Sequence, residues 1–408
     1  MKVLLSAYSC EPNKGSEDEV GWQCAVYLAA MGHDVWVLTR ANNRASIERE
    51  LDQRPPLPTL HFLYYDLPGW LRRWKSGRRG LSAYYVLWQW GGYRLAERAH
   101  RQVGFHLVHH VTFVSIRFPS FMGRLGIPFI FGPVGGGETA PLKLRRGYGW
   151  KGFVQDALRD LSNCFVSIDP LVRSTLRRAT RILVTSEQTR ALVPGAYQHK
   201  TAVHLAIGHE RRPPAECAAP SGGLSLLYVG QFRYWKGMHL GLRAFSLLLN
   251  ACPNARLTLI GRGSAEREWK RLASELGIAE RLIWISWLGR EELLRRYEQY
   301  DIFLYPSLHD SGAFVLLEAL SGGLPAVCFN LGGPGIIVDE TCGRVISVEN
   351  GSRDAIVRRL ADALRCLSTN EELRNQLRVG ARQRARHFEW QRQIRTLYET
   401  ADIRKASA

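Results

Sequence analysis

The feature that most constrains the fold is an alternation of short apolar runs with helical patterns, which occurs twice along the chain. In the first half, five runs have the length and composition of buried strands: Val3–Ala7, Val35–Thr39, Leu107–Val111, Pro128–Phe131 and Ile182–Thr185. A helix is predicted between the first two, from about Glu17 to Met31, and it ends near Gly32. Strands that alternate with helices predict a parallel sheet with helices on both faces.

The pattern restarts after residues 194–223, which are rich in proline, glycine and alanine and are typical of an interdomain linker. Strands are then predicted at Ser225–Gly230, Arg256–Ile260, Leu282–Ser286, Ile302–Tyr305 and Ala326–Phe329. Helices are predicted at Met238–Asn250, Ala265–Leu276, Glu291–Tyr300, Phe314–Ser321 and Glu371–Ala401. Two α/β halves joined by a linker predict a cleft, and open α/β sheets bind ligands at the carboxyl ends of their strands.

Composition narrows the classes of partner and the compartment. The 408 residues carry a formal net charge of +18, so we expect phosphate-bearing partners: nucleotides, nucleic acid or anionic lipid. The eight cysteines include no C-x-x-C pair, which favours reduced thiols in a cytosolic protein over zinc ligands or disulfides. The first apolar run is too short for a signal peptide, and no stretch of 18 uninterrupted apolar residues occurs, so any membrane contact is expected to be peripheral.

The segment His309–Glu318 carries the most chemical information. It follows a predicted strand, turns through Ser311 and Gly312, and opens a helix, whose first amide groups form an anion site. Glu318 lies among apolar residues of that helix, where a merely solvated carboxylate is unexpected. The alternative for Glu318 is an ordinary acid in the first turn of a helix. The alternative for Asp310 is an ordinary turn or N-cap residue.

Two further loops have the composition of phosphate-binding loops. Gly230–Gly237 follows a strand, precedes a helix and contains Arg233 and Lys236, whose cations can face a phosphate; a solvated basic loop is the alternative. Gly15-Ser16-Glu17 opens a helix in the first half, although a glycine turn alone is weak evidence. The sequence contains neither G-x-x-x-x-G-K-[ST] nor a G-x-G-x-x-G after the first strand, which argues against P-loop hydrolases and dinucleotide oxidoreductases.

In these motifs the chain resembles the retaining glycosyltransferases of family 4, also called group 1 glycosyltransferases. The most specific match runs from Tyr305-Pro306-Ser307 through Asp310-x7-Glu318 to Gly323-Leu324-Pro325 and Gly332-Gly333-Pro334-Gly335. The resemblance implies the GT-B fold, with two Rossmann-like domains facing a cleft. We expect an acceptor-binding domain at 1–200, a nucleotide-sugar domain at 201–385, and a C-terminal helix at 386–408 that returns to the first domain.

The resemblance also implies roles for individual residues. Glu318 would bind the ribose hydroxyls of the donor nucleotide, and Asp310 would lie near the hydroxyls of the transferred sugar. Lys236 would neutralise the leaving diphosphate. The remaining donor-side residues would be Gly15, Ser16, Gln231, Arg233, Gly312, Ala313 and Phe314. Members of this family use no metal and no cofactor, so cations and amide groups must stabilise the departing charge, and anomeric configuration is retained.

The chain departs from the family pattern at three places. Asp310 stands where the family usually has Glu, and Gln231 stands where it usually has Arg, with Arg233 two positions later as a substitute. The usual histidine after the strand Pro128–Phe131 is missing, because a triple-glycine loop follows there. Any catalytic histidine must then be His109 or His110, at the end of the preceding strand. We assign the catalytic role to His109 and acceptor-side roles to His110 and Glu138; a structural role is the alternative for both histidines.

Two basic segments with interleaved aromatic residues lie in the first half, at 70–79 and 143–151. Tryptophan and arginine together suit the headgroup region of an anionic membrane, and a solvated basic loop is the alternative. No motif of a nucleic-acid module accompanies the charge, so nucleic acid is not expected as a partner.

The resemblance therefore implies a hexosyltransferase that moves a sugar from a UDP- or GDP-linked donor to a glycan or polyprenyl-linked acceptor. The setting would be bacterial polysaccharide or glycoconjugate biosynthesis, in the cytoplasm or on the inner face of the plasma membrane. The alternatives are a non-catalytic GT-B binding protein and a GT-B epimerase or phosphorylase.

Overall fold

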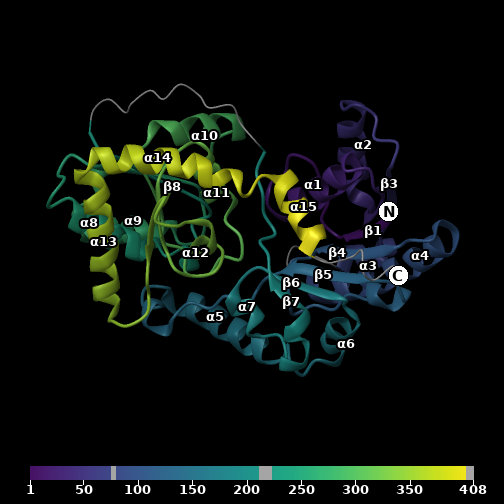
Figure 1. Cartoon of the computed structure of the whole chain (residues 1–408). Helices are drawn as coiled ribbons and strands as arrows, with labels where there is room; N and C mark the ends of the chain where they lie inside the picture. Colours follow the sequence, from purple (N-terminus) through teal and green to yellow (C-terminus); the bar gives the residue numbers. More distant parts are fainter. Residues whose placement is uncertain (75–79, 211–222, 401–408) are drawn as a thin grey trace. The chain divides into compact units, whose positions relative to one another are not determined.

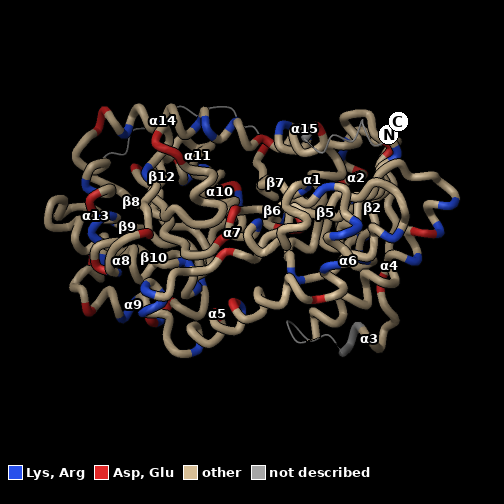
Figure 2. The backbone as a smooth tube through the Cα atoms, turned by 60° about the horizontal axis from the view of Figure 1, so that its bottom comes forward, with Lys and Arg blue, Asp and Glu red and all other residues tan. Residues whose placement is uncertain are grey.

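The computed structural model describes residues 1–74, 80–210 and 223–400, and its contacts divide the chain into two compact units (Figure 1). Unit 1 contains residues 1–137, 160–208 and the chain from Trp390 onward; unit 2 contains 138–159 and 209–389. Charged residues of both signs occur throughout both units (Figure 2). Because each unit contains separate stretches of the sequence, the chain crosses from one unit to the other more than once.

Unit 1 is built on a seven-stranded sheet in which every pair of neighbouring strands is parallel. Its strand order is β3-β2-β1-β4-β5-β6-β7, so the order reverses between β1 and β4. The strands are β1 Lys2–Ala7, β2 Asp34–Arg40, β3 Leu60–Tyr65, β4 Leu107–Thr112, β5 Phe129–Val134, β6 Arg181–Val184 and β7 Thr201–Val203. All residues of β1 except Lys2, and all of β4 and β5, are buried, as expected for central strands of a covered parallel sheet.

The helices of unit 1 are α1 Ser16–Ala30, α2 Arg44–Asp52, α3 Gly69–Trp74, α4 Leu81–Val103, α6 Pro170–Arg178, α7 Glu187–Arg190 and α15 Trp390–Thr400. Helix α15 comes from the far end of the chain and contacts α1 (Figure 1). Its buried face includes Trp390, Ile394, Leu397 and Tyr398. The C-terminal helix is thus part of the core of the unit that contains the N-terminus.

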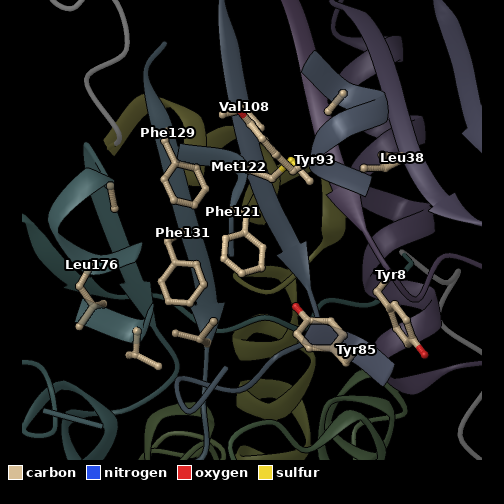
Figure 3. Close-up of a cluster of buried hydrophobic side chains, with 14 of the residues drawn as sticks. Tyr8, Leu38, Tyr85, Tyr93, Val108, Phe121, Met122, Phe129, Phe131 and Leu176 are labelled. Carbon is tan, nitrogen blue, oxygen red and sulfur yellow. The ribbon is translucent and has the colours of Figure 1, made fainter. Parts of the chain in front are cut away.

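An aromatic cluster fills the core of unit 1 (Figure 3). Phe129 and Phe131 project from β5, and Tyr85 on α4 lies edge-on to Tyr8, with ring centroids 5.2 Å apart. Trp88 meets the same Tyr8 ring at 5.0 Å, again edge to face. These are the favoured geometries of aromatic pairs, and they fix the end of β1 against α4.

Unit 2 repeats the architecture with a six-stranded parallel sheet in the order β10-β9-β8-β11-β12-β13. The strands are β8 Ser225–Val229, β9 Arg256–Ile260, β10 Leu282–Ile285, β11 Ile302–Tyr305, β12 Ala326–Phe329 and β13 Gly343–Ile346. The helices are α8 Met238–Leu248, α9 Glu266–Glu275, α10 Arg290–Arg296, α11 Phe314–Ser321, α12 Pro334–Ile337, α13 Arg353–Thr369 and α14 Glu371–Arg386. Helix α5, Gly149–Cys164, begins in unit 2 and ends in unit 1.

The prediction of two Rossmann-like parallel sheets is confirmed. Three strands were not predicted: β3, β7 and β13, of which β7 lies inside the supposed linker. The single helix predicted over 371–401 is two helices, because the chain leaves the helical conformation between Arg386 and Trp390, where the units meet in sequence. Residues 138–159, assigned by sequence to the first domain, contact unit 2 instead.

Candidate functional site

In unit 2 the strand order reverses between β8 and β11, the place where ligands of such sheets bind. The loop after β8 is Gly230–Gly237, and the loop after β11 runs from Pro306 to Ala313. The two predicted phosphate-binding segments of the second half, Gly230–Gly237 and His309–Glu318, therefore leave the sheet at this one point.

The Asp310 carboxylate joins these two loops. Its Oδ2 atom accepts hydrogen bonds from Lys236 Nζ at 2.6 Å, and from the hydroxyls of Tyr305 and Ser307, each at 2.7 Å. Its Oδ1 atom has no donor among the residues that the structure describes, and the side chain is partly exposed. One carboxylate oxygen is thus fixed by the protein, and the other is open to a ligand hydroxyl.

Tyr305 makes this arrangement rigid. Its hydroxyl accepts from Lys236 Nζ at 2.8 Å while it donates to Asp310. Burial, and then the Asp310 charge, raise the pKa of the Tyr305 hydroxyl well above its ordinary value, so it stays protonated and keeps donating. Lys236 is also mostly buried, and its charge is compensated by Asp310.

The two loops touch through their backbones. Gly237 has φ of +68°, and a Cβ built on it would lie 1.9 Å from the Pro306 carbonyl oxygen. Leu308 N donates to Trp235 O at 2.8 Å. A third loop closes on the same place, because Gly333 N donates to Asp310 O at 2.7 Å and Gly332 has no room for a side chain beside that oxygen. Glycine is required here by close approach of backbone.

Helix α11 begins beside Asp310. Gly312 and Ala313 precede it, Phe314 is its first residue, and no side chain caps its amide groups. First-turn amides have no acceptor within the helix, and they carry the positive end of the helix dipole. One turn later, Glu318 is partly buried and accepts from Tyr297 OH at 3.3 Å, with Arg290 3.8 Å away. A helix start with the chemistry to bind an anion thus lies between two carboxylates, Asp310 in the loop before it and Glu318 within it.

Sequence reasoning missed the partners that hold these acids. Tyr305 and Ser307 were identified only as parts of a motif, and Tyr297 and Arg290 were not identified at all. The two residues after β8 that were predicted to contact the donor lie in the expected loop. Gln231 is exposed, and Arg233 is partly buried, with its Nε 3.4 Å from Gln231 Oε1.

Glu138 lies in unit 2, which corrects its assignment to the acceptor side of the first domain. The chain leaves β5 through Gly135–Gly137, and Glu138 is buried beside Gly332, 3.8 Å from Arg159 Nη2. The following segment is held by Asp156, which is 3.4 Å from Arg145 and 3.0 Å from His309, the neighbour of Asp310. Residues 138–159 are thereby attached directly to the loop that contains the candidate site.

The two histidines of β4 are interior residues, so the predicted catalytic role of His109 and the acceptor-side role of His110 do not fit. His109 accepts from Tyr398 OH at 2.8 Å through Nδ1 and donates to Gly132 O at 2.6 Å through Nε2. His110 lies 3.4 Å from Tyr85 OH. Burial lowers the pKa of His109 to about 4 and that of His110 to about 3, so both stay neutral. β4 is central in its sheet, so residues on both of its faces are covered.

Gly15 and Ser16 form the start of α1 in unit 1. Both have positive φ, +67° and +55°, and space is open around Gly15. Next to them the Glu17 carboxylate accepts a hydrogen bond from Val114 N, and burial raises its pKa to about 7. The role of Gly15 and Ser16 toward a donor stays a prediction.

Of the first basic segment, the structure shows Trp70 as exposed, and the side chains of 72–79 lie outside the described residues. In the second, Arg145 is buried and paired, whereas Arg146, Trp150 and Lys151 are exposed.

Among the described residues, no cluster of three His, Cys, Asp or Glu side chains could hold a metal ion. None of the described helices is both long enough and apolar enough to span a bilayer.

Comparison with known proteins shows what this part of the chain is similar to. The model of the family described as "Glycosyl transferases group 1" matches residues 214–384, which include every loop described for unit 2 except 138–159. Residues 214–384 are thus similar to the shared domain of group 1 glycosyltransferases. Similar proteins include a D-inositol 3-phosphate glycosyltransferase of Saccharomonospora viridis, 28% identical over 63% of this chain, and a glycogen synthase of Mycobacterium tuberculosis, 29% identical over 54%. The alignments cover 58% and 53% of these relatives, so the chain spans about half their length.

Solved structures extend the likeness to the whole chain. Sucrose-phosphate synthase from Thermosynechococcus elongatus is 17% identical, with a TM-score of 0.68 and complete coverage of both chains. Anabaena HepE in complex with UDP gives a TM-score of 0.63 at 14% identity, covering 98% of this chain and 99% of its own. WaaG, a glycosyltransferase involved in lipopolysaccharide biosynthesis, gives 0.59 at 19% identity, covering 98% and 99%. At these identities the likeness shows the fold, so the matched domain is part of a GT-B structure, as predicted.

Glu17→Gln should stabilise the protein at pH 8 but not at pH 4.5. The folded pKa of about 7 exceeds the ordinary value of 4.5, so the favourable contribution of the protonated acid is complete below pH 4.5 and is lost as the pH rises through 7. The glutamine keeps an acceptor for Val114 and cannot ionise. We expect a gain of about 1–3 kcal/mol at pH 8, measured by urea denaturation.

The control is Glu187→Gln, an exposed acid on α7 of the same unit. It should change the free energy of unfolding by the same small amount at both pH values. A Glu17→Gln effect that is equal at pH 4.5 and pH 8 would contradict the raised pKa.

Proposed function

We propose that this protein transfers a sugar from a nucleoside-diphosphate sugar to a glycan or lipid-linked acceptor. The observation that carries the proposal is the Lys236–Asp310 pair, which joins the loops after β8 and β11. The pair lies beside the uncapped start of α11, within the part of the chain that is similar to group 1 glycosyltransferases. A cation, the amide groups of a helix start and a half-open carboxylate are what a sugar diphosphate requires.

The proposed chemistry assigns one task to each group. Lys236 and the amides of Gly312, Ala313 and Phe314 would stabilise the negative charge that develops on the leaving diphosphate. The free Oδ1 of Asp310 would accept a hydroxyl of the transferred sugar, and Glu318 would accept the ribose hydroxyls. We propose that transfer retains anomeric configuration and needs no metal ion, because fixed cationic and amide groups supply the electrostatic stabilisation.

The finer features of the donor, acceptor and setting are part of the same proposal. The solved complex of HepE with UDP supports a uridine donor, with GDP sugars as the alternative. The likeness to WaaG supports a role in bacterial polysaccharide or glycoconjugate biosynthesis. A lipid-linked acceptor would place the enzyme at the cytoplasmic face of a membrane, and the exposed cations of 143–151 suit an anionic surface.

Incubation with a panel of UDP and GDP sugars in EDTA tests the activity. We expect slow hydrolysis of one donor, because water can replace a missing acceptor, and NMR should show release of the sugar with its original anomeric configuration. A protein that binds one of these donors without cleaving it would instead be a non-catalytic member of the fold. Cleavage only with added divalent metal would refute metal independence.

Glu318→Ala should weaken nucleoside-diphosphate binding by about tenfold to a hundredfold. The ribose hydroxyls lose a charged acceptor, and such a bond contributes about 1.5–3 kcal/mol. Calorimetry with UDP and GDP measures the change. Glu275→Ala, an exposed acid on α9, is the matched control and should bind as the wild type does. Unchanged affinity in a folded Glu318→Ala protein would remove the ribose role.

Lys236→Ala should lower kcat more than it lowers donor affinity, because the leaving-group charge is largest in the transition state. Asp310→Asn should be nearly inactive while it remains folded, whereas Asp310→Glu should keep measurable activity. Lys270→Ala, an exposed lysine on α9, should behave as the wild type. If Lys236→Ala raises KM alone, the lysine only binds the donor. Full turnover by Asp310→Asn would exclude the carboxylate charge from the mechanism.

A further inference from the structure

The outward side of α5 is apolar. Trp150, Phe153, Val154, Leu158 and Leu161 recur at spacings of three and four residues, which places them on one side of the helix. All five are exposed, Trp150 at 73% and Leu158 at 61% of their full areas. We call these five residues the outer face of α5. Exposed apolar side chains are ordinary when scattered, but a continuous row along a helix indicates a surface that is covered in use.

The inward side of the same helix is polar, so the usual arrangement of an amphipathic surface helix is reversed. Asp156 is 1% exposed and lies near Arg145 and His309 within unit 2. At the last turn, Asn163 is buried and accepts from Arg117 at 2.6 Å within unit 1. These buried polar contacts fix the rotation of the helix, so the apolar side chains cannot turn inward without leaving charges unpaired.

The surroundings of the outer face are cationic. Residues 142–159, the part of this surface that belongs to unit 2, contain one acid, Asp156, and it is buried. Of their five basic side chains, Arg146 and Lys151 are exposed. Leu142, just before α5, is 70% exposed.

We propose that the outer face of α5 inserts shallowly into an anionic lipid bilayer. An apolar row flanked by arginine and lysine matches the acyl boundary and the phosphate layer of such a surface. A second copy of this chain is the alternative occupant, and the experiment distinguishes it from a bilayer. The inference rests on the proposed function and deepens the proposed action on a lipid-linked acceptor, because it names a helix that inserts beside the basic residues.

The proposal is tested by co-sedimentation with sucrose-loaded vesicles of phosphatidylcholine, with or without 40% phosphatidylglycerol. The wild type should bind the anionic vesicles, and a part of the binding should persist at high salt, because screening leaves apolar contacts intact. Trp150→Ser/Phe153→Ser/Leu158→Ser should bind at least tenfold more weakly at both salt concentrations. Arg146→Ser/Lys151→Ser should lose binding mainly at low salt.

The matched control is Leu247→Ser/Ile283→Ser/Val379→Ser, which removes three exposed apolar side chains from other elements of unit 2 and should bind as the wild type does. Circular dichroism and UDP or GDP calorimetry on each variant separate loss of docking from loss of the fold or of the donor site. Equal sedimentation of the wild type and the α5 triple variant would refute insertion. A wild type that self-associates without vesicles, while the triple variant is monomeric, would assign the face to a contact between copies.

Discussion

The arrangement of the candidate site depends on one short ion pair, the contact between Lys236 and Asp310. The two residues are 74 positions apart, and they meet because β8 and β11 are neighbours at the point where the strand order reverses. Tyr305 and Ser307 add two donors to the same carboxylate oxygen, so its position does not rely on the lysine alone. A partly buried charge in a low dielectric is stabilised by such pairing, and the pairing leaves the second oxygen without a donor among the described residues.

The segment 138–159 extends this network beyond the sheet. Asp156 lies near His309, whose ring is stacked on Trp235 with centroids 5.4 Å apart. His309, the neighbour of Asp310, therefore contacts this segment directly, and Trp235, the neighbour of Lys236, contacts it through His309. His239 Nε2 meets Leu144 O at 3.1 Å, and Tyr148 packs against Tyr234. The buried polar side of α5 and the candidate site therefore share one set of contacts within unit 2, and the solvent-facing side of the helix is free for a different task.

Much of the fold followed from local patterns, and the remainder depended on tertiary contacts. Strands β1, β4, β8 and β11 are continuous apolar runs, and such runs are recognisable because both faces of a parallel strand are covered. Strand β7 has three residues and lies at a sheet edge, so its pattern is too short to stand out from a linker. The break between α14 and α15 was missed because helical residues continue through it, and only the separate packing of the two helices reveals it.

The candidate site was likewise predicted where local patterns mark its residues and missed where tertiary contacts decide. Asp310, Glu318 and Lys236 were found because glycine turns and helix starts mark them in the sequence. Their partners were missed because Tyr297 and Arg290 reach Glu318 from elements with no motif of their own. The histidines of β4 were misjudged because a residue at the end of a strand can face a ligand or the core, and the sequence does not say which. Only the contacts with Tyr398 and Gly132 show that His109 faces the interior.

Gly237 gives this site a geometrical property that depends on no charge. Its Cα lies against the Pro306 carbonyl, so the distance between the two loops is the thickness of two bare backbones, the smallest that a polypeptide allows. Lys236 is the residue before it, and Asp310 is four residues beyond Pro306. A methyl group at position 237 would therefore push the two loops apart and disturb the ion pair without altering a charged residue.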